Sequence, residues 1–109
     1  MKIKCNANEL NIACQNVQKS SATKATLPAL EGFLLKAENN EIIITGYNLE
    51  MGIITKINAE VKEIGSIVLN AKVLCGILKN LPKDEVEITV NKTTCKIVCG
   101  NVKYEVKGI

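Results

Sequence analysis

Two segments of the chain share one spacing of hydrophobic and polar residues. Residues 6–17 read NANELNIACQNV and residues 70–81 read NAKVLCGILKNL. At about 100° per residue, each segment collects its apolar residues on one face of a helix. These residues are Leu10, Ala13, Cys14 and Val17 in the first segment, and Val73, Leu74, Ile77, Leu78 and Leu81 in the second. The pattern predicts two amphipathic helices, and their similarity indicates a duplicated unit.

The opposite face of each predicted helix is polar. It carries Asn8, Asn11, Gln15, Gln18 and Lys19 in the first helix, and Lys72, Cys75, Gly76, Lys79 and Asn80 in the second. Ile12 is the one apolar residue on the polar face of the first helix. Asn6 followed by Glu9 resembles a capping box, which predicts that the first helix begins there.

Segments rich in branched apolar residues surround the two helices. The predicted strands are KIKC (2–5) and SIVL (66–69) before the helices, FLLKA (33–37), EIIIT (41–45) and GIITKINAE (52–60) after the first, and EVEITV (85–90), CKIVCG (95–100) and NVKYEVK (101–107) after the second. Asn39-Asn40 suits a tight hairpin because Asn tolerates positive φ, and NKTT (91–94) suits another turn. The sequence therefore predicts an α+β domain with a β-α-β-β-β unit repeated twice. Both helices would pack on one side of an antiparallel sheet with their polar faces on the same side.

The connector after the first helix is longer than its counterpart LPKDE at 81–85. Within it, Pro28 holds the apolar stretch TLPAL extended, because its ring fixes φ. The preceding polar stretch predicts an exposed loop beside the first helix that carries Ser20, Ser21 and Lys24. At this level the loop can equally be an inert surface segment.

Composition narrows the class of protein. The chain has 109 residues, 47% of them hydrophobic, which suits one domain with one core. Its 14 basic residues are all lysines, against 11 acidic residues. Lysine lacks the planar fork with which arginine reads guanine, so any contact with nucleic acid should be made to phosphates and be independent of sequence. Codon usage explains the abundance of lysine equally well. No secretory signal or membrane-spanning apolar run occurs, which predicts a cytoplasmic protein with no membrane partner.

The five cysteines predict buried, reduced thiols, because there is no histidine and no CxxC motif to form a metal site. Cys95 and Cys99 share one face of a predicted strand and would be the basis of an alternative, a thiol redox protein. A second alternative is an autonomous intracellular α+β module that binds a small ligand or a protein. No catalytic constellation and no Gly-rich phosphate loop occurs, so we expect no enzymatic activity, no metal and no cofactor.

Four stretches together resemble a known family: MKIKCNANEL (1–10), TLPAL (26–30), ITGYNLEMGI (44–53) and LPKDEVEITV (81–90). They are similar, in the family's order, to the amino-terminal domain of the bacterial sliding clamp, the beta subunit of DNA polymerase III. The resemblance covers residues 1–109 as the first domain, so the family's second and third domains are absent from this chain. The chain departs from the family pattern at Ala29, where a larger aliphatic residue is usual, and at Tyr47-Asn48, where Thr-Asp is frequent.

The resemblance implies a non-catalytic processivity factor of the DNA polymerase III holoenzyme. In the family, two three-domain subunits join head-to-tail into a ring that encircles duplex DNA, with helices lining the hole and sheets outside. Lys24 and Lys72 match basic, DNA-facing positions of the family, and the geometry of the helix faces adds Lys79 and Gln15. DNA polymerase III and the clamp loader would bind through a groove between the two domains missing here.

The last predicted strand alternates between Val102, Tyr104 and Val106 on one face and Lys103, Glu105 and Lys107 on the other. In the family, the matching strand lies at a sheet edge and pairs with the third domain of the neighbouring subunit. The resemblance therefore assigns Lys103, Tyr104 and Val106 to the subunit interface, and Ile77, at the margin of the second helix's apolar face, is expected to join them. The alternative is that Tyr104 and Val106 serve only the core of this domain.

Overall fold

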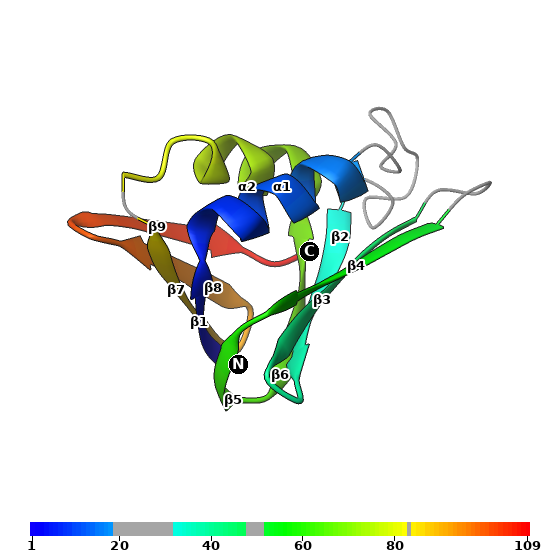
Figure 1. Cartoon of the computed structure of the whole chain (residues 1–109), viewed down its shortest axis with the longest axis horizontal. Coiled ribbons are helices and arrows are strands. Elements are labelled where there is room, and N and C mark those ends of the chain that lie inside the picture. The colour runs from blue at the N-terminus through cyan, green and yellow to red at the C-terminus, as the bar shows by residue number, and fades with distance from the viewer. Residues whose placement is uncertain (19–31, 48–51, 83) are drawn as a thin grey trace.

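The computed structural model describes residues 1–18, 32–47, 52–82 and 84–109. Both helices lie side by side on the same side of the sheets (Figure 1). In chain order the elements are β1 (Lys2–Asn6), α1 (Ala7–Gln18), β2 (Gly32–Glu38), β3 (Glu41–Tyr47), β4 (Gly52–Asn58), β5 (Glu60–Glu63), β6 (Gly65–Asn70), α2 (Ala71–Leu78), β7 (Glu85–Asn91), β8 (Thr94–Cys99) and β9 (Val102–Lys107). The predicted α+β class is confirmed, and the repeated β-α-β-β-β order is found with one additional strand, β5, between the two units.

The strands form two antiparallel sheets. One has five strands in the order β5-β1-β7-β8-β9, and the other has four in the order β4-β3-β2-β6. The first strand of each half pairs in the sheet of the other half: Ile3 of β1 lies opposite Ile88 of β7, and Leu69 of β6 lies opposite Phe33 of β2. The duplicated units are therefore joined by an exchange of strands.

Asn40 shapes the first half in two ways. Asn39 and Asn40 have φ values of 51° and 57°, which confirms the predicted tight hairpin between β2 and β3. The carbonyl oxygen of Asn40 also accepts from the Ala59 nitrogen at 3.0 Å, and its Oδ1 accepts from the Val61 nitrogen at 3.4 Å. These bonds hold the chain where it passes from β4 to β5. The predicted strand 52–60 therefore ends at Asn58, and β5 is a further strand that was not predicted.

Equivalent asparagines begin the two helices. Oδ1 of Asn6 accepts from the Glu9 nitrogen at 2.9 Å, and Oδ1 of Asn70 accepts from the Val73 nitrogen at 3.0 Å. Each bond satisfies one of the backbone N–H groups that a helix N-terminus leaves without a partner. The predicted start of α1 is confirmed, and α2 begins in the same way.

One core lies between the helices and the sheets. Its largest fully buried side chains are Phe33, Ile3, Leu10, Leu35, Ile42, Ile44, Leu69, Leu74, Ile88, Ile97, Val17 and Val86. The buried face predicted for α1 is confirmed at Leu10, Ala13, Cys14 and Val17, and Ile12 is exposed as predicted.

Two positions of α2 lie on the face opposite to the predicted one. Val73 is 47% exposed, whereas Cys75 is 2% exposed. Cys75 faces α1, and its Sγ lies 3.4 Å from the carbonyl oxygen of Cys14. The buried side of α2 is thus shifted towards α1, because α2 packs against a neighbouring helix as well as against the sheets.

Candidate functional site

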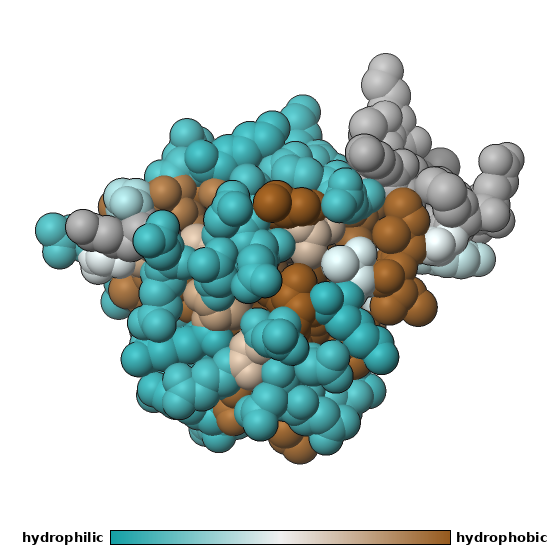
Figure 2. Space-filling view, in the orientation of Figure 1, coloured by the Kyte–Doolittle hydropathy of each residue, from teal (hydrophilic) through white to brown (hydrophobic). Residues whose placement is uncertain are grey.

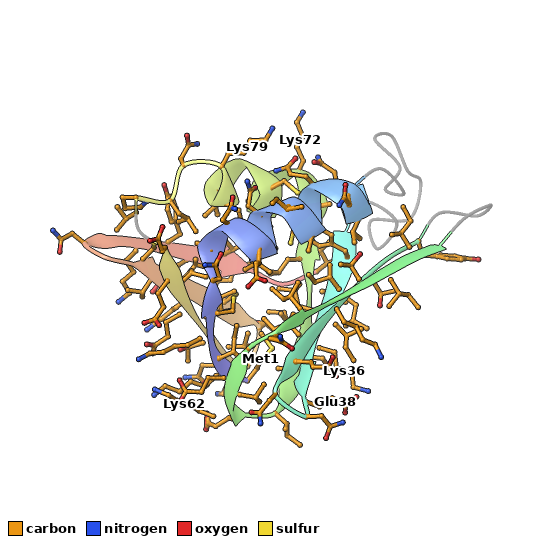
Figure 3. The ribbon with its side chains drawn as sticks, in the orientation of Figure 1. Met1, Lys36, Glu38, Lys62, Lys72 and Lys79 are labelled. Carbon is orange, nitrogen blue, oxygen red and sulfur yellow. The ribbon has the colours of Figure 1, made fainter. Side chains whose placement is uncertain are left out.

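The polar surface of α2 presents two lysines. Lys72 is in the first turn of the helix and Lys79 is its C-cap residue. Both side chains extend into solvent on the side of the helices that faces away from the sheets (Figure 3), and both residues are exposed. Seven residues of helix separate the two positions by about 10 Å along the axis. The sequence-based prediction that Lys72 and Lys79 share an exposed helical face is confirmed.

The neighbouring surface of α1 has a different chemistry. Between Ala7 and Gln18, α1 has no lysine, and its exposed or half-buried polar residues are mainly amides: Asn8, Asn11, Gln15, Asn16 and Gln18. Ile12, 53% exposed, lies among them. Within the described helices the lysines therefore belong to α2, while α1 offers mainly uncharged amides that bind water, together with one exposed carboxylate, Glu9.

Gln15 joins the two helices. Its side chain is half-buried, and Nε2 donates to Oδ1 of Asn11 at 3.1 Å and to the carbonyl oxygen of Cys75 at 3.4 Å. The amide hydrogens that would reach a phosphate are therefore directed within the protein. Contact between Gln15 and DNA remains a prediction, and its carbonyl oxygen, which only accepts hydrogen bonds, would reach a phosphate through a bridging water.

The prediction for Lys24 lies outside the described residues. The same holds for Ser20, Ser21 and Pro28 of the connector, and for the departures from the family pattern at Ala29 and Asn48.

Strand β9 forms one edge of the five-stranded sheet. It pairs with β8, where Tyr104 lies opposite Ile97 and Val106 lies opposite Cys95. Tyr104 and Val106 are half-buried and pack against the core, whereas Lys103 is exposed. The predicted alternation is thus confirmed, and the outer edge of β9 is not paired with any described strand. Backbone groups along such an edge can pair with another strand.

Val73 is an exposed apolar residue of α2, although the sequence pattern had placed it in the core. Val73 and Ile77 are four residues apart and therefore lie on the same side of α2. Ile77 is half-buried against the core, and Val73 is largely exposed. The signal that could have identified Val73 is its place at the margin of a wide apolar arc, where burial depends on the neighbouring element.

The cysteines do not form a reactive site. None of the five is in a disulfide and all are buried, as predicted. Burial raises the pKa of Cys75 and of Cys95 to about 11, with Lys79 partly opposing the shift at Cys75, and burial with Glu9 and Glu85 raises the pKa of Cys5 to about 12. At neutral pH these thiols are protonated, which is the unreactive form.

The described part of the chain contains no group of three or more His, Cys, Asp or Glu side chains that could hold a metal ion. Among these same residues, no helix is long and apolar enough to cross a membrane.

Two helices, of which α2 carries exposed lysines, lie against two sheets, and β9 forms a free edge. This arrangement defines a class of protein, a duplicated α+β domain of the DNA-clamp type. The model of the DNA polymerase III beta subunit, N-terminal domain, matches residues 1–109, and the chain belongs to this family.

Relatives and solved structures agree with this assignment. The chain is 32% identical to the beta sliding clamp of Synechococcus elongatus over 100% of its own length and 30% of the relative's. It is 34% identical to that of Halalkalibacterium halodurans, with 86% of this chain and 27% of the relative covered. The DNA polymerase sliding clamp of Bacillus subtilis superposes with a TM-score of 0.96 at 27% identity, covering 100% of this chain and 31% of that structure. The chain thus spans about a third of the length of the proteins it matches.

Proposed function

We propose that this chain is the DNA-facing amino-terminal domain of a cytoplasmic sliding clamp, a non-catalytic processivity factor that encircles duplex DNA and tethers the replicative DNA polymerase III. The observation that carries the proposal is the pair of exposed lysines on α2 in a domain of the DNA polymerase III beta family. DNA polymerase III and the clamp loader would bind through parts of the longer protein beyond this domain.

The chemistry of the helix surface suits movement along DNA. Lysine contacts a phosphate as a point charge, without the fixed geometry that reads a base edge. The amides of α1 suit water-mediated contacts, which are individually weak. Such a surface attracts the duplex in any sequence and holds no single position on it.

The proposal can be tested with lysine substitutions in the full-length ring. Replacing Lys72 and Lys79 together with alanine should lower the log–log slope of DNA affinity against salt by about 0.9 for each lost phosphate contact, equally for all sequences. Adding Lys24→Ala should lower it further. The measurement is DNA association at a series of salt concentrations. Lys62→Ala is the matched control, because Lys62 is exposed on β5 at the side of the molecule opposite α2.

An unchanged slope in the Lys72–Lys79 variant, or an equal fall in the Lys62 control, would remove these lysines from the DNA site. The 109-residue domain alone should bind duplex DNA poorly, since retention by a ring depends on enclosing the duplex.

We further propose that β9 closes the ring by pairing head-to-tail with the neighbouring subunit, with Lys103, Tyr104 and Val106 in the contact and Ile77 and Val73 beside it. The free edge, the half-buried apolar side chains and the exposed Val73 support this assignment. The isolated domain, which lacks the complementary surface, should be monomeric at micromolar concentration.

In the full-length protein, Tyr104→Asp should shift the ring towards single subunits, because a carboxylate would be buried against apolar groups. Sedimentation at matched concentrations measures the shift. Glu105→Gln is the control, since Glu105 is exposed on the opposite face of the same strand. A folded Tyr104→Asp dimer of wild-type affinity would show that β9 does not close the ring.

A further inference from the structure

The outward faces of the two sheets differ in chemistry. On the five-stranded sheet, charges of opposite sign lie opposite one another across strands. One cross-strand row runs Glu60, Lys4, Glu87, Val98, Lys103 and the next runs Glu63, Lys2, Thr89, Lys96, Glu105. Opposite charges in facing positions stabilise a sheet that faces water.

The outward face of the four-stranded sheet has an apolar row instead. Val68, Leu34, Thr45 and Ile54 lie opposite one another across all four strands. Ile54 is 66% exposed, and Tyr47, farther along the same face, is 55% exposed. In Figure 2, hydrophobic residues gather on the right-hand side of the molecule, where β3 and β4 lie in Figure 1. Exposed apolar patches of this kind mark surfaces that bind other molecules.

Ile109 already contacts the β6 side of this face. The backbone nitrogen of Ile109 donates to the carbonyl oxygen of Val68 at 2.9 Å. The side chain of Ile109 lies over Gly32, where a Cβ would approach Ile109 Cδ1 to 2.8 Å. The face thus accepts a branched aliphatic side chain, and glycine at position 32 leaves the space for it.

Lysines adjoin the apolar row. In the next row, Ile43 lies between Lys36 and Lys56, and the acidic residues of this face, Glu38 and Glu41, lie one row farther from the apolar row. Lys36 is 3.6 Å from the Glu38 carboxylate, and the two side chains lie together at the outer side of β2 (Figure 3). Lys56 is exposed and makes no ion pair with any residue in the described ranges. A ligand on the apolar row would therefore find an unpaired cation at its margin.

We propose that the outward face of β2, β3 and β4 binds an extended acidic segment of a partner protein. Aliphatic side chains of this segment lie on Leu34 and Ile54, and one carboxylate pairs with Lys56. The site is separate from the helix surface and from the edge of β9, so it does not depend on the proposed DNA contact or ring closure.

The test uses the isotope-labelled 109-residue chain and a blocked peptide probe, Glu-Val-Asp-Ile-Glu-Val-Asp-Ile, followed by amide chemical shifts. The matched control probe has lysine in place of each acidic residue. The acidic peptide should shift the amides of Leu34, Ile43, Ile54 and Lys56. Ile54→Ser should weaken its binding about tenfold through lost apolar contact. Lys56→Glu should weaken it about fivefold and favour the basic peptide. Both residues are exposed, so both variants should remain folded.

Three outcomes would overturn the proposal. The first is equal binding of the two peptides, or no binding at millimolar concentration. The second is a set of shifts confined to the free edge of β4, with the variants unaffected. The third is that the face is already covered when no peptide is present. A second copy of the chain on the face would make the amide chemical shifts depend on protein concentration. The protein's own chain on the face would protect these amides from exchange in the full-length ring.

Discussion

The two helices hold equivalent places in the fold but present different surfaces. Asn6 and Asn70 cap them in the same way, and Leu10 and Leu74 are both fully buried. Outside the core, α1 exposes amides, Glu9 and Ile12, whereas α2 exposes Lys72, Lys79 and Val73. The two copies are thus similar at positions where side chains are buried or accept a hydrogen bond from the backbone, and they differ at positions exposed to solvent. The internal repeat therefore predicts the fold, while the charge of each copy has to be read separately.

The largest effect should come from the shared core positions. Leu10→Ala and Leu74→Ala should each lower the free energy of unfolding by about 2–5 kcal/mol, because each leaves a cavity beneath a helix. Urea denaturation of each variant measures the loss. Ile12→Ala is the control, with a small expected effect because Ile12 is 53% exposed. A loss at one leucine several times that at the other would show that the two halves do not share the core equally.

Removing the N-cap side chain of either helix should lower the free energy of unfolding by a smaller amount, and by the same amount in both helices. Asn6→Ala and Asn70→Ala should each cost about 1 kcal/mol, because a backbone N–H at the start of the helix loses its acceptor. Asn→Asp at the same positions keeps an acceptor and should preserve most of the stability. Thermal unfolding compares the four variants. If either alanine variant is as stable as the parent, the cap bond in that helix does not contribute.

The smallest effect should be a gain confined to α2. Gly76 lies in this helix, and a Cβ there would meet nothing within 4 Å. Gly76→Ala should therefore raise stability by up to about 1 kcal/mol, since alanine favours a helix over glycine. Gly32→Ala is the contrasting variant, because its Cβ would lie 2.7 Å from the carbonyl oxygen of Leu69. A destabilised Gly76→Ala protein would contradict the open surface described for this side of α2.

Features determined by short-range pattern could be predicted from the sequence. The phase of α1, the Asn39-Asn40 hairpin and the alternation along β9 all depend on residues close together in the chain. The division into two sheets and the exchange of β1 and β6 could not be predicted, because alternation gives the face of a strand but not its partner.

The candidate site follows the same rule. The shared face of Lys72 and Lys79 was predictable from helical spacing alone. The hydrogen bond from Gln15 to Cys75 could not be predicted, because it depends on how α1 and α2 meet. The exposure of Val73 and the burial of Cys75 could not be predicted for the same reason. Periodicity gives the centre of an apolar arc reliably and its margins poorly.

The exchange of strands has a consequence for how the protein comes to fold. Within this domain β1 is the first strand to be synthesised, and it has one neighbour in β5 and the other in β7, which comes late in the domain. Pairing between such distant segments requires a large loop to close, which slows folding. Ile3 and Cys5 therefore remain unpaired with β7 until most of the domain has been synthesised. A ribosome that stalls before β7 would hold a nascent chain with an apolar strand uncovered, a substrate suited to a chaperone.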